Sequence, residues 1–229
     1  MTAEEYTTYK TQGYPMSATV GKDGAEPNDT YVQQLVADAL TGALVASRGQ
    51  LDLVGFIFFA TLTGIGGGTL RDLVLGRDPV FWVDRPVLLV LTAAAACVVF
   101  LTAHLLESRY RALLWLDACA LAVAVPAGVG VALAMGVSPV VVVVMGVMTG
   151  SFGGLMRDVI SNEVPLILKQ GELYVTAAFG GALAAVILMG FGCGRGWALI
   201  GCGAVVLILR AGSMTCGWRL PVYKARPPR

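Results

Sequence analysis

Two stretches of the chain carry the same pattern of glycine, arginine and aspartate residues. The first, LTGIGGGTLRDLVLGRDP, runs from Leu62 to Pro79, and the second, MTGSFGGLMRDVISNEVP, runs from Met148 to Pro165. At a constant offset of 86 positions, seven residues recur: Thr63, Gly64, Gly67, Gly68, Arg71, Asp72 and Pro79 match Thr149, Gly150, Gly153, Gly154, Arg157, Asp158 and Pro165. The fixed offset predicts two copies of one structural unit.

The composition places this duplication in a membrane protein. Of the 229 residues, 56% are apolar and 14% are charged, with a mean hydropathy of +0.74. Soluble domains carry roughly a quarter charged residues, so a soluble fold would lack the polar surface to cover so much apolar chain. The net charge of +1, without a basic stripe, argues against a nucleic-acid partner. We therefore predict an integral membrane protein embedded in a lipid bilayer.

Seven apolar runs are long enough to cross a bilayer, for which about 20 helical residues suffice. They lie at about 31–47, 52–75, 86–106, 112–135, 138–161, 172–190 and 196–212. The runs show no alternation of period two, which excludes the strands of a membrane barrel. The predicted fold class is an all-α polytopic membrane protein with seven transmembrane helices.

The duplication and the number of spans together predict two inverted repeats. Asp38 in VADAL and Asp117 in LDACAL precede the two motifs, and they match each other if the second unit contains a seven-residue insertion. Each unit then has three spans, and an odd number forces the units to cross the membrane in opposite directions. The predicted organisation is a polar, disordered tail at 1–29, a first three-helix repeat at 30–111, a second, inverted repeat at 112–195, a seventh helix at 196–213 and a basic tail at 214–229.

Basic residues outside the spans predict the orientation. Five, such as Arg77 and Arg85, fall on the side of the N-terminus, and nine, among them Arg48, Arg210 and Arg219, fall on the opposite side. Cytoplasmic loops carry the excess of lysine and arginine. We therefore expect the C-terminal tail in the cytoplasm and the N-terminal tail outside it.

The glycine clusters fall in the middle of predicted spans. Each helical glycine costs about 1 kcal/mol relative to alanine, so the clusters predict a break in both helices. Broken backbone survives in a membrane only against protein or water, and its freed polar groups can face a permeating solute. The alternative is close helix packing, which small residues also permit. The predicted path comprises Gly66, Gly67, Gly68, Gly153, Gly154, Thr63, Thr149, Ser151 and Phe152.

Six ionisable residues lie within or near the ends of the spans: Asp38, Asp117, Arg71, Asp72, Arg157 and Asp158. Asp38 and Asp117 lie deepest, and a charge at such depth usually faces water or a partner. Because adjacent residues on a helix do not face one another, we expect crossed pairs, Arg71 with Asp158 and Arg157 with Asp72, or a pair of each arginine with Asp38 or Asp117. A purely structural ion pair that locks the two helices together is the alternative.

No catalytic or metal-binding set accompanies these residues. The five cysteines show no CxxC spacing, and His104 is the single histidine. Asp38 and Asp117 lack the sequence context of an intramembrane protease dyad, in which two carboxylates share a proton. We expect neither an enzyme nor a cofactor or metal site.

The motifs also carry a family resemblance. The stretches GIGGGTLRDLVLGRDPVFWV and GSFGGLMRDVISNEVPLILKQGELYVTAAFGGALAA, preceded by Asp38 and Asp117, resemble those of the prokaryotic trimeric intracellular cation (TRIC) channels, over about residues 31–222. The same bacterial membrane domain has been labelled a glycine transporter. The resemblance implies a homotrimer in the bacterial inner membrane, with one hourglass pore in each protomer. The second and fifth helices would kink at their glycines and line a path for monovalent cations, potassium above all.

The second motif departs from the first at one position. Phe152 stands where the first motif has Gly66, so the two halves of the path are unequal there. Phe152 is either a hydrophobic constriction or a packing residue. The hydroxyls of Thr63, Thr149 and Ser151 either supply oxygens to a cation or bond back to their own helices.

These observations predict a potassium channel in which Asp38 and Asp117 bias the path toward cations. A secondary transporter for a small zwitterion such as glycine is the alternative, since the same architecture would serve it. A membrane scaffold without transport is a third possibility.

Overall fold

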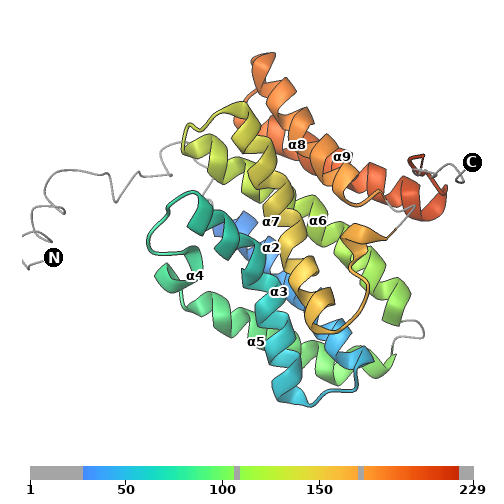
Figure 1. Ribbon diagram of the computed structural model, residues 1–229. Helices are drawn as coiled ribbons and strands as arrows, with labels where there is room; N and C mark the ends of the chain where they lie inside the picture. Colours follow the sequence, from blue (N-terminus) through green and yellow to red (C-terminus); the bar gives the residue numbers. More distant parts are fainter. Residues whose placement is uncertain (1–27, 106–108, 170–172, 222–229) are drawn as a thin grey trace, which may run out of the picture.

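The computed structural model describes residues 28–105, 109–169 and 173–221 (Figure 1), and within these ranges every regular element is a helix. The long ones are α2 (Asn28–Arg48), α3 (Leu53–Val74), α5 (Val87–Thr102), α6 (Arg109–Ala134), α7 (Pro139–Ile160), α8 (Val175–Gly190) and α9 (Arg195–Thr215). Short helical turns, α4 (Phe81–Asp84), η1 (Ala103–Leu105) and η2 (Leu166–Leu168), lie between them. The seven predicted spans are confirmed as helices. Most of the predicted tail at 1–29, and the predicted basic tail from 222 onward, lie outside the described residues.

Five of these helices are long and apolar enough to cross a membrane, judged by length and composition. They are α3, α5 continued by η1, α6 from Tyr110, α7 and α9. α8 is apolar but has 16 residues, and α2 carries polar residues such as Gln33 and Gln34 in its first half. Both are nevertheless integrated in the bundle, because α2 packs against α3 and α6 while α8 packs against α9 and α7.

The two motif helices end in the same way. Gly76 after α3 and Asn162 after α7 both adopt positive φ, at 66° and 57°. In each copy the amide of the next residue donates to the carbonyl five positions earlier, at 2.8 and 2.9 Å. This left-handed helix end satisfies carbonyls that lack an intrahelical donor. The duplication therefore extends to backbone conformation.

α3 and α7 cross in direct backbone contact. A methyl group on Gly67 would overlap the carbonyl oxygen of Thr149, and one on Gly153 would overlap the carbonyl oxygen of Thr63. Residue numbers increase in opposite directions through these contacts, so the two helices are antiparallel. Because α3 and α7 are equivalent helices of the two units, the units are inverted, as predicted.

The glycine clusters do not break their helices. Helical structure runs without interruption through 66–68 in α3 and through 153–154 in α7. The predicted breaks are therefore wrong, and the alternative of close packing describes the crossing correctly. Glycine is required at Gly67 and Gly153 because any side chain there would occupy the space of the facing backbone.

The first helix of each unit packs on the second in a common register. A methyl group on Gly42 in α2 would overlap the carbonyl oxygen of Phe59, and one on Gly128 in α6 would lie 2.6 Å from the carbonyl oxygen of Met145. Both pairs of positions differ by the same 86 residues that separate the motifs.

This register corrects the predicted match between Asp38 and Asp117. No seven-residue insertion separates α6 from α7, so Asp38 corresponds to Ala124. Asp117 lies seven residues, about two turns, earlier in its helix than that position. The sequence places an aspartate in the first helix of both units, but at different depths.

Each unit has its own apolar core. In the first, α2, α3 and α5 bury residues such as Leu44, Phe56 and Ala96. In the second, α6, α7, α8 and α9 enclose a cluster that includes Val125 and Val206. α9 thus joins the core of the second unit only.

We predict that Gly67→Ala and Gly153→Ala destabilise the protein equally, because a methyl group at either position forces α3 and α7 apart. Overpacking costs about 1–3 kcal/mol, which exceeds the gain of about 1 kcal/mol in helix propensity. Thermal unfolding of the detergent-solubilised protein measures the effect. Gly196→Ala in α9, where a methyl group has no neighbour within 4 Å, is the matched control and should not lower the melting temperature. Equal melting temperatures for all variants would contradict the crossing.

Candidate functional site

The first Arg-Asp pair closes the end of α3. Arg71 Nε donates to Asp72 Oδ1 at 2.8 Å, and both side chains are fully buried. Arg77 Nη1 donates to the same oxygen at 3.1 Å, and the Phe81 amide donates to Asp72 Oδ2 at 2.9 Å. The guanidinium of Arg71 also lies 5.6 Å from the ring centroid of Phe81. Asp72 thereby fastens the start of α4 to the last turn of α3.

The second pair repeats this arrangement and adds a third member. Arg157 Nε donates to Asp158 Oδ1 at 2.8 Å, and the Leu166 amide donates to Asp158 Oδ2 at 2.9 Å. Arg157 Nη1 also donates to Asp117 Oδ1 on α6 at 3.1 Å. The second unit therefore holds a buried arginine between two carboxylates.

These contacts correct the predicted pairing. Each arginine pairs with the aspartate next to it, because the long arginine stem folds back until its Nε meets the neighbouring carboxylate. The crossed pairs are wrong, because Arg71 and Asp158 lie on opposite sides of an antiparallel crossing, about 20 Å apart at 1.5 Å per residue. The alternative pairing of an arginine with a deep aspartate is confirmed for Arg157 and Asp117.

The two deep aspartates lie toward the same end of the crossing. A methyl group on Gly154 would lie 3.6 Å from Asp117 Oδ1. The contacts of α2 with α3 bring Asp38 level with Thr63, which touches Gly153. Asp38 is 8% exposed, and the charges that act on it are those of Asp117 and Arg157. Although Asp38 belongs to the first unit, the interior of the bundle is therefore more acidic at the end of the crossing that holds Arg157 and Asp158, the acidic end.

The predicted path residues divide into two groups. Thr63 Oγ1 donates to the Phe59 carbonyl at 2.7 Å and is satisfied within its own helix. Thr149 Oγ1 and Ser151 Oγ are buried and have no hydrogen-bond partner among the described residues. Phe152 is partly buried. Of the three hydroxyls predicted for the path, the two on α7 therefore remain available to a solute.

Two other glycines of the first motif make space for the side chains of neighbouring residues. A methyl group on Gly66 would lie 3.1 Å from Met156 Sδ, and one on Gly68 would lie 2.6 Å from the ring of Phe81. Gly66 and Gly68 thus explain two further glycines of the first motif by packing.

Two residues of the acidic end were missed by sequence reasoning. Tyr174 is 3% exposed, and Arg210 of α9 is fully buried with its guanidinium 4.9 Å from the Tyr174 ring centroid. The predicted orientation counted Arg210 among the basic residues that flank the spans, which is wrong because Arg210 is buried. Without it, eight basic residues remain on that side against five on the other, so the predicted orientation is unchanged. An arginine inside the apolar run VVLILRAG was the signal that could have identified it.

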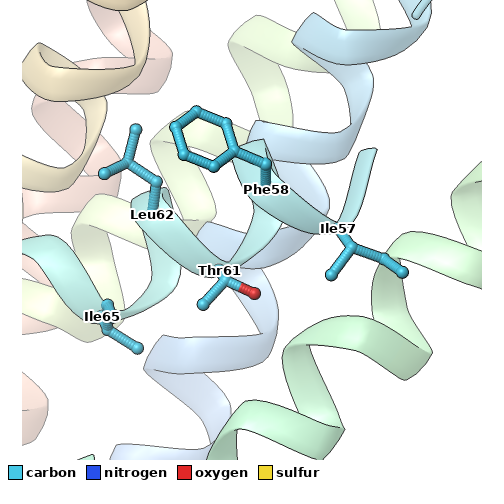
Figure 2. Close-up of a pocket in the computed structure, with 5 residues that line it drawn as sticks. All are labelled: Ile57, Phe58, Thr61, Leu62 and Ile65. Carbon is cyan, nitrogen blue, oxygen red and sulfur yellow. The ribbon is translucent and has the colours of Figure 1, made fainter. Parts of the chain in front are cut away.

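A separate hollow of about 350 Å³ lies on the outer face of α3 (Figure 2). Its lining consists of Ile57, Phe58, Thr61, Leu62 and Ile65, all from one helix. The hollow is apolar and holds none of the charged residues, so it suits an apolar neighbour rather than an ion. Among the described residues, no group of three or more His, Cys, Asp and Glu side chains is arranged to hold a metal ion.

Comparison with known proteins relates the chain to one group of membrane proteins. A family model described as "Glycine transporter" matches residues 32–104 and 114–190. The inner membrane protein YadS of Escherichia coli strain K12 is 35% identical over 190 residues, which cover 81% of this chain and 90% of YadS. A membrane protein of Vibrio cholerae is also 35% identical over 190 residues, covering 81% of this chain and 77% of that protein.

Two solved structures share the fold. The TRIC trimeric intracellular cation channel orthologue from Rhodobacter sphaeroides is 44% identical, with a TM-score of 0.81 over 84% of this chain and 98% of that one. A further TRIC cation channel is 30% identical, with a TM-score of 0.76 over 88% of this chain and 98% of that one. The segments matched by the family model extend from α2 to η1 and from α6 to α8, so α9 lies outside both.

We predict that Asp158→Asn lowers the free energy of unfolding by about 3–5 kcal/mol, because it leaves Arg157 buried with one carboxylate fewer. Chemical denaturation in detergent measures this loss. Asp84→Asn is the matched control: its contact with Arg85 is 3.8 Å long and both side chains are about half exposed, so the change should stay within about 1 kcal/mol. Similar effects of the two substitutions would contradict a stabilising role of the buried pair.

Proposed function

Because this chain belongs to the prokaryotic TRIC channel family, whose membrane domain is also described as a glycine transporter, we propose that it conducts monovalent cations, potassium above all, across the bacterial inner membrane. Two comparisons support this. The 44% identical structure is described as a cation channel, and YadS is described as an inner membrane protein.

The observation that carries the proposal is a set of buried polar atoms on α6 and α7. Thr149 Oγ1, Ser151 Oγ and Asp117 Oδ2 are buried and lack hydrogen-bond partners among the described residues. Buried polar atoms without a protein partner usually have water or an ion beside them. The excess of carboxylates near Gly153 gives that space a negative potential, which attracts cations and repels anions.

In this proposal the path runs within each protomer, beside the crossing of α3 and α7. The backbone contacts of Gly67 and Gly153 make the crossing its narrowest point. The helices are unbroken there, so ions meet side-chain oxygens rather than freed main-chain groups. Conduction requires α3 and α7 to move apart or bend at their glycines, and the arrangement described here is a closed one. Phe152 then lies at the constriction as a partly buried apolar side chain.

The assembly is inferred from a relative and the orientation from the basic residues. We infer a homotrimer, because the 44% identical structure is described as a trimeric channel, and the apolar hollow on α3 fits a membrane or protomer neighbour. From the excess of basic residues on that side we infer that the C-terminus lies in the cytoplasm.

A secondary transporter for a small zwitterion such as glycine is the second candidate. The description of the matching family model favours it. Paired buried charges of both signs around Arg157 also suit an ammonium and a carboxylate group. A transporter would show saturable uptake and counterflow without unitary currents.

We predict unitary currents from the purified protein in planar bilayers. Under a tenfold KCl gradient the reversal potential should approach about 59 mV in magnitude, the value for an ideally cation-selective path. Asp38→Asn removes a buried negative charge beside the constriction and should move the reversal potential toward zero. Asp84→Asn, an exposed carboxylate near the other motif, is the control and should leave it unchanged. Glycine counterflow in vesicles without unitary currents would establish the transporter instead.

The orientation is tested with reporters fused to the C-terminus. Green fluorescent protein should fluoresce there, and alkaline phosphatase should be inactive, because the tail lies in the cytoplasm. An active phosphatase fusion at that end would show the inverted topology.

A further inference from the structure

The seventh helix is fixed to the second unit on two sides. A methyl group on Gly203 of α9 would lie 2.7 Å from the carbonyl oxygen of Ala122 in α6, and one on Gly181 of α8 would lie 2.7 Å from the carbonyl oxygen of Cys202 in α9. Pro126 has no amide hydrogen, so the Ala122 carbonyl lacks its helical donor and leaves α6 open to this approach. Backbone contact on both sides keeps α9 in a defined register.

The last turns of α9 hold the segment that leads into α8. Ser213 Oγ accepts a hydrogen bond from the Leu173 amide at 3.1 Å. One turn earlier, the guanidinium of Arg210 lies over the Tyr174 ring, 4.9 Å from its centroid. All four residues are buried. The position of Tyr174 is therefore set by α9.

Tyr174 in turn reaches the charged cluster of α7. Its hydroxyl oxygen lies 3.2 Å from the position that a methyl group on Gly154 would occupy. Asp117 Oδ1 and Arg157 Nη2 both lie 3.6 Å from the same point. Gly154 thus opens a space in which the hydroxyl, the carboxylate and the guanidinium converge. Through Tyr174, α9 is connected to the residues placed beside the path.

The buried charges at this end of the crossing show what α9 adds. Asp38, Asp117 and Asp158 face a single arginine of the two repeats, Arg157, and the charge of Arg210 also acts on Asp117. Arg210 is therefore the second buried positive charge at this end. Buried charges without compensation are costly in a low-dielectric interior.

The first unit provides the comparison. Its buried Asp72 pairs with both Arg71 and Arg77, and the Phe81 ring of the short α4 lies over the Arg71 guanidinium. The buried positions of α5 and α8 coincide at the offset of 86 residues, and Leu88 occupies the position of Tyr174. The tyrosine and the seventh helix thus occur together, at the end of the crossing where Asp38 and Asp117 also lie.

We propose that Arg210 of α9, held against the Tyr174 ring, is a positioning residue that sets how tightly cations bind at the carboxylates of the second unit. This inference rests on the proposed channel function. An ion site must attract cations but release them quickly enough for conduction. Arg210 reduces the negative potential of Asp117, so a passing cation is not trapped.

The test measures channel conductance against potassium concentration. Arg210→Met keeps an unbranched apolar side chain but removes the charge, and it should lower the half-saturating potassium concentration by about tenfold. Arg210→Lys keeps the charge and should shift it less. The double variant Arg210→Met with Asp117→Asn restores the net charge and should return the value toward that of the wild type. Arg195→Met at the other end of α9, where the arginine donates to the Gly130 carbonyl, is the matched control and should not change it.

Several results would overturn the inference. A folded Arg210→Met variant with an unchanged half-saturating concentration would do so, as would an equal shift in Arg195→Met. If Arg210→Met does not fold, Tyr174→Leu, which installs the residue found in the first unit, must shift the half-saturating concentration in the same direction, or the inference is wrong.

Failure of the proposed function would be recognised separately. A wild-type protein without currents would refute the channel. Whether the charges of Arg210 and Asp117 interact would then be decided by a double-mutant cycle in thermal unfolding between Arg210→Met and Asp117→Asn. Coupling between the two substitutions would support the interaction, and additivity would overturn it.

Discussion

The contact between α3 and α7 determines the rest of the architecture. Each helix presents a glycine to a backbone carbonyl of the other, Gly67 to Thr149 and Gly153 to Thr63. In hydrocarbon no hydrophobic force draws helices together, so close approach of small residues is a main source of attraction. The antiparallel contact orients the two units in opposite directions and sends the two Arg-Asp pairs to opposite ends of the crossing.

The two ends are alike in backbone and different in charge. Asp72 and Asp158 both fasten the chain that follows their helices, through amides eight or nine residues further on. Only the end that holds Arg157 and Asp158 has additional carboxylates, those of Asp38 and Asp117, together with Arg210 from α9. Because the scaffold is duplicated but only one of these two ends is acidic, the electrostatic potential differs between the two ends of the crossing. We consider this asymmetry, more than the symmetry of the motifs, to be the basis of the proposed function.

Most of the fold could be predicted from the sequence, because the length of an apolar span is a local property and the motif occurs twice. Span lengths predicted the helices, and the duplicated motif with three spans per unit predicted the inversion. The register of Asp38 and Asp117 was not predictable, since two aspartates in similar apolar contexts resemble each other, whereas the contacts of Gly42 and Gly128 define the true alignment. The breaks were predicted wrongly because glycine destabilises an isolated helix but stabilises a crossing.

The path beside the crossing is the central claim, and anomalous diffraction from crystals grown with rubidium or thallium in place of potassium tests it most directly. These ions scatter strongly enough to be located without assumptions about the protein. Peaks inside every protomer, next to Gly153 and the carboxylate of Asp38, are the predicted result. Peaks confined to the axis between protomers would contradict it.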